Sequence, residues 1–427
     1  MCKCIKIRGH SISKSINGAV KELQNPSVLL TDGDLKVTFP ILRSLAMKGV
    51  ETGVAATRSK AMSFFSKFCK NRLLYPSPRE NLTLFLKTIQ KIVKKTDYDI
   101  LFPIGEWTLV PISEHREKIT PYINLPLPSK EAIRKTFNKA STIKLAQEEN
   151  VPIPKTFHIH NIRDLNKESK EISYPAVIKS RWSWAWNGDK TNAYVSRPRY
   201  VNSHQELLSA YKSMHNEFPF PIIQEYVPGV PYHVGVLCSH SRLRAICCIK
   251  EHRTIPVTGG YATLRETVEL DYRMKEIALR LLKALNWHGV AEVEFKLDPR
   301  DSTPKFMEIN GRFWGSLELA MAAGVDFPYL LYLLAVDDDV KPVLKYSVGV
   351  KRRWIEGDLI YISNVLKNVG FHADVKYPDK WRALIEFLKI YDAKFDCLYW
   401  DDLLPFLSRF LWGDIPGILL RKFTRNR

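Results

Sequence analysis

Apolar and polar residues alternate along two short segments that lie close together in the chain. In residues 291–297 every second position is apolar, and residues 307–312 begin with the same alternation. A period of two predicts half-buried β-strands, because successive side chains of a strand point to opposite faces. Residues 298–304, between the two segments, are rich in proline and short polar residues, which is typical of a turn. The pattern therefore predicts a β-hairpin.

The polar face of this hairpin carries candidate metal ligands. If the strands fold back symmetrically about Asp301, Glu294 lies opposite Glu308. Carboxylates that face each other across a strand pair repel, and Mg²⁺ accepts oxygen ligands from one or two carboxylates. Asn310 adds a neutral oxygen on the same face, and Arg312 adds a fixed positive charge. The alternative is a solvated strand face on which the two acidic residues meet without binding anything.

Short apolar runs alternate with a helical pattern near the start of the chain. Strands are predicted at residues 28–30, 50–57 and 99–105, and a helix at residues 39–47. Strands that alternate with helices at this spacing imply a parallel sheet covered by helices. Gly33 follows the first strand, but a G-x-G-x-x-G fingerprint is absent, so this region is expected to be a scaffold or substrate wall.

A second group of elements follows a proline-rich joint at residues 126–129. Ser129 is placed to cap a helix that begins at residue 130. The strand predicted at residues 174–179 ends in Lys179. The remaining elements of this group are a strand at 221–229 and helices at 140–150, 273–285, 318–323 and 329–335.

Composition narrows the class of protein. The 427-residue chain has a formal net charge of +19, and residues 1–125 hold 20 Lys/Arg against 10 Asp/Glu. These cations are scattered and show no zinc-finger spacing or ribonucleoprotein motif, so nucleic-acid binding is not expected as the main function. The seven cysteines form no CxxC pair, which favours reduced thiols in a cytoplasmic protein. No apolar run reaches the roughly 20 residues of a spanning helix, and residues 1–18 lack the apolar core of a secretory signal.

The order of the motifs resembles the ATP-grasp superfamily. A lysine at the start of the helix that ends before Val-Pro-Ile-Pro154, the strand lysine, Gln-Glu-Tyr-Val-Pro-Gly229 and the hairpin with Glu-Ile-Asn-Gly-Arg312 follow one another as they do in that superfamily. The similarity is greatest to its carbamoyl-phosphate-synthetase-like branch of carboxylate–amine ligases. The resemblance covers residues 27–336.

The resemblance implies an α/β fold class with a defined domain order. A mobile basic extension is expected at residues 1–26 and a pre-ATP-grasp parallel-sheet domain at 27–125. The two-lobed ATP-grasp fold is expected at 126–336, with its small lobe at about 174–228. A small C-terminal region occupies 337–427.

The family's site residues are carried over where this sequence matches them. Lys139 and Lys179 resemble the two lysines that contact ATP phosphates, a role that suits an ammonium. Arg253 and residues 258–260 resemble a segment beside phosphates and substrate, and Arg312 resembles a phosphate-stabilising cation. The adenine hinge and ribose contact are expected at Gln224, Glu225, Tyr226, Val227 and His233. The metal set is Glu294, Glu308 and Asn310, which would hold Mg²⁺, or Mn²⁺ in its place.

One segment departs from the family. Many ATP-grasp proteins place a glycine-rich loop after the strand lysine, whereas here Trp182, Trp184 and Trp186 alternate and only Gly188 is present. The three indoles are expected to share one face of an extended strand. Either they pack the small lobe, or they form an apolar lid that excludes water from a reactive phosphate.

The resemblance implies an ATP-dependent ligase that joins a small-molecule carboxylate and amine through an acyl phosphate, with ADP and phosphate released. The alternative is an ATP-binding regulatory module without turnover, which the tryptophan-rich loop favours. The tail holds apolar residues at helical spacing near 403–412 and a basic end at 421–427. This is typical of a core or partner helix, or of an interfacial helix at the inner face of the membrane. The sequence leaves the substrates and the oligomeric state open.

Overall fold

The computed structural model describes residues 25–182, 184–186, 193–257, 259–368, 378–389 and 392–412, with the backbone alone for 184–186 and 193–195. These residues form two compact units. Unit 1 contains the described residues up to Leu127, Pro328–Val340 and those from Cys397, and unit 2 contains Pro128–Phe327 and Lys341–Asp396. The C-terminal region expected at 337–427 is therefore divided between the units.

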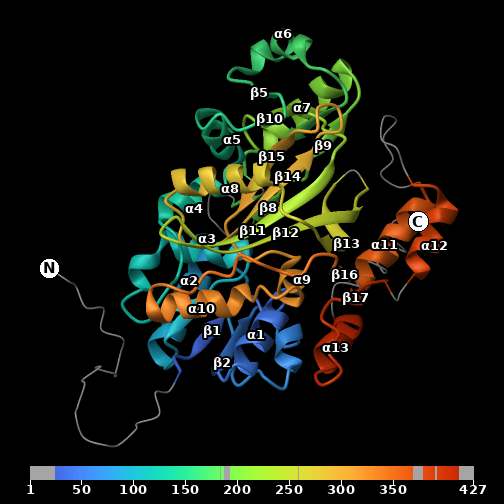
Figure 1. The fold of residues 1–427 in the computed structure, drawn as a ribbon. Helices are drawn as coiled ribbons and strands as arrows, with labels where there is room; N and C mark the ends of the chain where they lie inside the picture. Colours follow the sequence, from blue (N-terminus) through green and yellow to red (C-terminus); the bar gives the residue numbers. More distant parts are fainter. Residues whose placement is uncertain are drawn as a thin grey trace, which may run out of the picture. The chain divides into compact units, whose positions relative to one another are not determined.

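Unit 1 is built on a parallel sheet, as the sequence predicts. Its strand order is β3-β2-β1-β4, and every strand pair in it is parallel. The strands are β1 (Val28–Leu30), β2 (Thr52–Ala56), β3 (Arg72–Leu74) and β4 (Ile100–Phe102). Helices α1 (Thr38–Met47), α2 (Leu82–Lys95) and α3 (Glu106–Glu114) alternate with them (Figure 1). Strands β1, β2 and β4 are buried along their whole length, as parallel strands covered by helices are.

Two C-terminal pieces complete unit 1. Helix α10 (Phe327–Asp337) offers the Ala335 carbonyl to the Asn124 side chain at 2.8 Å. Helix α13 (Leu404–Trp412) packs on the short 3-10 helix η1 (Met62–Phe65), where the rings of Phe65 and Trp412 stack at 5.2 Å. Helices α10 and α13 therefore belong to the same unit as the first sheet.

The outer face of α13 allows a test of membrane contact, which is the alternative to a core or partner helix. Leu404, Leu407 and Leu411 are 62%, 48% and 64% exposed and recur at helical spacing. If α13 binds a membrane, Leu407→Glu/Leu411→Glu should reduce sedimentation with anionic liposomes about tenfold or more, because two apolar side chains lose their lipid contact. Leu84→Glu changes a leucine of α2 that is 50% exposed and serves as the matched control. Equal recovery of all three proteins would refute the contact.

Among the described helices none has the length and apolar character to span a bilayer.

The first sheet of unit 2 is small and antiparallel. Its order is β5-β10-β6-β9, formed by β5 (Thr156–His158), β6 (Ala176–Lys179), β9 (Arg199–Val201) and β10 (Ile222–Glu225). Helix α7 (His204–Glu217) packs its buried Leu207, Tyr211 and Met214 against this sheet, with Ile178 and Ile223 in the same core. The small lobe predicted at about 174–228 contains β6, β9, β10 and α7, whereas β5 and part of this core come from residues before 174. Two helices precede it, α4 (Lys130–Thr136), capped by Ser129 as predicted, and α5 (Lys139–Glu148).

The second sheet of unit 2 has seven strands in the order β15-β14-β11-β12-β13-β16-β17. The strands are β11 (Val230–Ser239), β12 (Arg242–Ile255), β13 (Tyr261–Thr267), β14 (Gly289–Leu297), β15 (Pro304–Asn310), β16 (Lys351–Arg353) and β17 (Lys394–Phe395). One face packs on helix α8 (Tyr272–Ala284), where Leu281 and Leu282 join Val293 and Phe295 in an apolar core. Side chains alternate along a strand, so Glu292 and Glu294 belong to the opposite face.

The remaining described elements lie around these sheets. Strands β7 (Trp184–Trp186) and β8 (Ala193–Val195) pair with each other, so the backbone of the tryptophan segment is extended as predicted. The side chains of Trp184 and Trp186 lie outside the described residues, so their shared face and the lid stay predictions. Helices α9 (Leu317–Ala322), α11 (Ile355–Leu366) and α12 (Lys380–Leu388) complete unit 2.

Candidate functional site

The hairpin of β14 and β15 places the two predicted carboxylates opposite each other. Glu294 pairs with Glu308 and Glu292 pairs with Asn310 in the antiparallel register, so the predicted opposition is confirmed. A bulge follows, because Phe295 pairs with Phe306. The extra residue is Met307. Because of it, the side chain of Phe306 points into the core while that of Glu308 stays on the polar face.

Donors from helix α5 and from β15 itself hold the carboxylates. Lys139, the first residue of α5, places Nζ 2.7 Å from Oε2 of Glu308. Nδ2 of Asn310 donates to Oε1 of Glu294 at 2.6 Å and to Oε2 of Glu292 at 3.2 Å. Arg312 in turn donates to Oδ1 of Asn310 at 3.2 Å. Four of the predicted site residues, Lys139, Glu294, Glu308 and Asn310, are thus in one group with Arg312 at its edge.

The two opposed carboxyls differ in their electrostatic surroundings. The charge of Lys139 holds the pKa of Glu308 well below its usual range, helped by Lys179 and Arg312. Desolvation and the neighbouring charge of Glu308 raise the pKa of Glu294 well above its usual range. A cation at the hairpin would therefore meet one firmly ionised carboxylate and one whose ionisation the cation itself would favour.

Lys179 ends β6 and is electrostatically coupled to the same group. Desolvation and the charge of Lys139 together lower its pKa to about 8, although the charges of Glu308 and Glu294 oppose the shift. The backbone N–H of Lys139 donates to the Arg181 carbonyl at 2.8 Å, which ties the start of α5 to the segment just after β6. This bond brings the two predicted phosphate lysines to the same carboxylates from different elements.

His233 on β11 lies among three carboxylates rather than among apolar neighbours. Its Nε2 is 2.8 Å from Oε1 of Glu251, and its Nδ1 is 3.2 Å from Oε1 of Glu292 and 3.9 Å from Oε1 of Glu294. Desolvation alone would lower the pKa of His233, but these three charges raise it well above its usual value. The expected ribose contact of His233 stays a prediction.

The predicted adenine hinge follows β10. Gln224 is buried and donates to Thr156 at 3.0 Å, while a carboxylate oxygen of Glu225 accepts from the Lys155 backbone N–H at 3.1 Å. The Tyr226 N–H donates to the Pro175 carbonyl at 3.1 Å. The Val227 carbonyl accepts from Nζ of Lys296 on β14 at 3.1 Å. This last bond connects the hinge to the strand that carries Glu294.

Arg253 is placed differently from the other predicted residues. Its NH2 lies 3.5 Å from Oδ2 of Asp358, and its guanidinium lies over the ring of Tyr361 at 5.8 Å, both on α11. The described contacts do not join it to the carboxylates of the hairpin. Of the loop at 258–260, Thr258 lies outside the described residues. Gly259 and Gly260 have φ values of +125° and +157°, which favour glycine.

Sequence reasoning missed three charged residues of this face: Glu251, Glu292 and Lys296. Glu292 and Lys296 were visible in the alternation of β14, since they share the face of Glu294. The pKa of Lys296 falls to about 8 through desolvation and the charge of Lys179. Glu251 carried no such signal, because β12 and its pairing with β11 were not predicted.

The donor set fits a hard divalent cation. Glu294 and Glu308 supply carboxylate oxygens from facing positions, and the amide oxygen of Asn310 has a second lone pair beside the one that accepts from Arg312. Lys139 now occupies one oxygen of Glu308 and leaves the other for a ligand. The residues therefore fit the magnesium ion that the resemblance implies.

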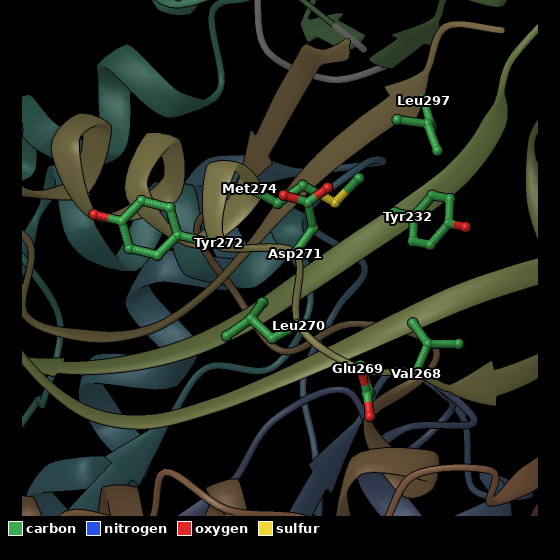
Figure 2. Close-up of a pocket in the computed structure, with 8 residues that line it drawn as sticks. All are labelled: Tyr232, Val268, Glu269, Leu270, Asp271, Tyr272, Met274 and Leu297. Atoms are coloured by element: carbon green, nitrogen blue, oxygen red, sulfur yellow. The ribbon is translucent and has the colours of Figure 1, made fainter. Parts of the chain in front are cut away.

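A cavity of about 360 Å³ lies on the other face of the same sheet. Figure 2 shows Tyr232 and Leu297 on one side of it and Asp271 and Met274 on the other. Tyr232 alternates with His233, and Leu297 alternates with Lys296, so this cavity opens away from the carboxylates. It does not belong to the candidate site.

Comparisons with known proteins show what the chain is similar to. A family model described as "ATP-grasp in the biosynthetic pathway with Ter operon" matches residues 217–357. The D-aspartate ligase of Enterococcus faecium is 23% identical over 257 residues, which cover 54% of this chain and 58% of that ligase. The chain thus spans little more than half the length of this curated relative.

Solved structures show the same fold. The L-amino acid ligase of Bacillus licheniformis superposes with a TM-score of 0.60 at 16% identity, over 77% of this chain and 79% of that one. The biotin carboxylase domain of the 2-oxoglutarate carboxylase of Hydrogenobacter thermophilus, solved with MgADP and bicarbonate, gives 0.59 at 15% identity, over 76% and 73%. The chain has the ATP-grasp fold. The resemblance predicted from the sequence, to the carboxylate–amine ligases of that superfamily, is confirmed.

Proposed function

We propose that the chain is an ATP-dependent carboxylate–amine ligase that forms an amide through an acyl phosphate. The observation that carries the proposal is the opposition of Glu294 and Glu308 on the β14–β15 hairpin, with Asn310 and Lys139 bonded to them. A hairpin with only a structural role would not require two facing carboxylates, an amide and a lysine in one group.

The proposed reaction has two steps. A carboxylate oxygen of the first substrate attacks the γ-phosphorus of ATP, the bond to the β–γ bridging oxygen breaks, and ADP leaves. The amine of the second substrate then attacks the acyl carbon, the bond to the phosphate oxygen breaks, and inorganic phosphate leaves. The amine gives up one proton as the amide forms.

The residues of the site supply charge and position in this proposal. Lys139, Lys179 and Arg312 would neutralise phosphate oxygens, which is preorganised electrostatic stabilisation. Glu294, Glu308 and Asn310 would hold Mg²⁺, or Mn²⁺ in its place, and the bound ion would offset the negative charge of the β- and γ-phosphates. The segment from β10 to Val227 would bind adenine, and Lys296 holds the Val227 carbonyl in place.

The proposal is tested by ADP release from MgATP with a panel of amino acids and sugar-linked acids, taken in pairs. We expect ADP release to require a carboxylate substrate. A heavy-oxygen label in that carboxylate should appear in the released phosphate, because the attacking oxygen leaves with the phosphoryl group. Hydroxylamine in place of the amine should trap a hydroxamate. Tight MgATP binding without ADP release for any pair would favour the regulatory module instead.

A further inference from the structure

A second group of metal-type ligands lies beside the carboxylate pair. Ligand atoms of His233, Glu292 and Glu294 all lie within 4.8 Å of one another. His233 comes from β11, and the two glutamates come from the neighbouring strand β14, where His233 pairs with Glu294. The antiparallel register therefore builds the group, and Glu294 belongs both to it and to the facing pair with Glu308.

The imidazole of this group is buried and poorly hydrogen-bonded. His233 is 8% exposed, Glu292 is 4% exposed, and Glu251 is 7% exposed. Nδ1 comes within 3.2 Å of Oε1 of Glu292 yet makes no hydrogen bond of acceptable geometry, whereas Nε2 lies 2.8 Å from Oε1 of Glu251. Buried polar nitrogens without a well-directed partner are costly, so this arrangement calls for a ligand that the protein atoms do not supply.

The balance of charge around His233 also favours a bound cation. Two buried carboxylates, Glu251 and Glu292, and the partly buried Glu294 surround one imidazole that carries at most one positive charge. Buried carboxylates need a paired cation or a metal. A proton on His233 would neutralise only one of them. A divalent ion would neutralise two.

One of the distances matches that between neighbouring ligands of a small divalent ion, and the other is somewhat longer. Ligand bonds of about 2.1 Å place adjacent ligand atoms about 3.0–3.4 Å apart and opposite ones about 4.2 Å apart. Nδ1 of His233 lies 3.2 Å from Oε1 of Glu292, an adjacent spacing, and 3.9 Å from Oε1 of Glu294, between the adjacent and the opposite spacing. Ser316 donates to Oε1 of Glu292 at 3.3 Å and restrains that carboxylate.

Glu251 is placed to act as an outer partner of the histidine. Its Oε1 lies 2.8 Å from Nε2, the ring nitrogen that does not face Glu292 and Glu294. A histidine that binds metal through one nitrogen usually gives the N–H of the other to a carboxylate, which fixes its tautomer and raises its basicity. Glu251 occupies that outer position from β12.

We propose that His233, Glu292 and Glu294 bind a divalent first-row transition-metal ion of the manganese–iron–zinc class, with Glu251 as the outer partner of the histidine. One imidazole with carboxylates is a donor set of that class, whereas magnesium prefers oxygen alone. The ion would neutralise the buried glutamates and hold Glu294 toward Glu308 before nucleotide binds. The proposal stands without the ligase activity, because the ion needs neither ATP nor substrate.

The test uses the full chain, stripped with chelator and free of nucleotide, with substoichiometric Mn²⁺ as the probe. Pulsed electron paramagnetic resonance should show modulation from a directly bound imidazole nitrogen in the wild type. His233→Gln should abolish this nitrogen signal. Glu251→Gln should keep the signal but weaken Mn²⁺ binding by about 10- to 100-fold, the usual cost of removing an outer partner.

Glu308→Gln is the matched control, since it removes a carboxylate of the facing pair outside this donor set, and it should keep the nitrogen signal. Circular dichroism and thermal melting check that each variant is folded. Absence of nitrogen modulation in the wild type, or its persistence in folded His233→Gln, would overturn the proposal. The wild-type spectrum decides the matter even if His233→Gln fails to fold. If the wild type shows no nitrogen modulation but has normal carboxylate-dependent ADP release, this metal site is removed and the ligase proposal is left intact.

Discussion

Glu308→Gln is expected to lower MgATP-dependent ADP release by about a hundred- to a thousandfold or more. The substitution keeps the volume of the side chain but removes one of the two facing carboxylates that would hold the metal. It also removes the anion that Lys139 contacts at 2.7 Å, so the lysine is no longer held by charge. Losing a preorganised charge at a phosphoryl-transfer site costs at least this much. The measurement is initial-rate ADP release over a range of Mg²⁺ concentrations.

A matched control separates this effect from a general loss of charge. Glu276 is an exposed glutamate of α8 that pairs with Arg280, on the helix that covers the other face of the sheet. Glu276→Gln should keep wild-type turnover. Near-normal ADP release by folded Glu308→Gln, at any Mg²⁺ concentration, would remove the assignment of the metal ligands.

The sequence predicted the parts of the site that depend on short-range pattern. The alternation in β14 and the turn after it were enough to place Glu294 opposite Glu308, because an antiparallel hairpin fixes register locally. It could not predict the bulge next to this pair. Strict alternation would put Phe306 on the face of Glu308, and only packing in the core shows that Phe306 turns inward.

The rest of the site depends on pairings between distant strands. Strands β11, β12 and β13 form the middle of the large sheet, yet no strand was predicted in residues 230–267. Burial is one reason: the middle of β12, residues 245–249, is buried continuously, so it lacks the alternation of a half-exposed strand. The position of Glu251 beside His233 follows from this sheet order, which a local pattern does not encode. The resemblance, rather than the pattern, supplied the roles of Lys139 and Lys179.

Lys179→Met is expected to weaken ATP binding by about ten- to a hundredfold and to change its pH dependence. Desolvation lowers the pKa of Lys179 to about 8 in the nucleotide-free protein. Phosphate groups favour the ammonium form, so ATP binding should raise this pKa and take up a proton above pH 8. Wild-type affinity should therefore fall as pH rises through about 8. The loss of one charge-assisted contact accounts for the size of the effect.

Stability should respond with the opposite sign. The pKa of Lys179 is about 8 in the folded chain and 10.5 in its unperturbed form, so the unfolded chain binds more protons between these values. Lys179 therefore destabilises the fold fully below pH 8, and this cost disappears as pH rises toward 10.5. Lys179→Met should melt at a higher temperature than the wild type at pH 7, and the difference should vanish near pH 10.

Calorimetry in two buffers of different ionisation enthalpy measures the proton uptake directly. Lys170→Met changes an exposed lysine of the same lobe and should leave affinity, proton uptake and melting temperature unchanged. Desolvation and the charge of Lys179 give Lys296 a similarly low pKa, so Lys179→Met should raise the pKa of Lys296 and leave a smaller residual proton uptake. An unchanged pH profile of ATP binding in Lys179→Met would show that this lysine does not meet the phosphates. The charge that neutralises them would then have to come from Lys139 and Arg312 alone among the predicted cations of the hairpin group.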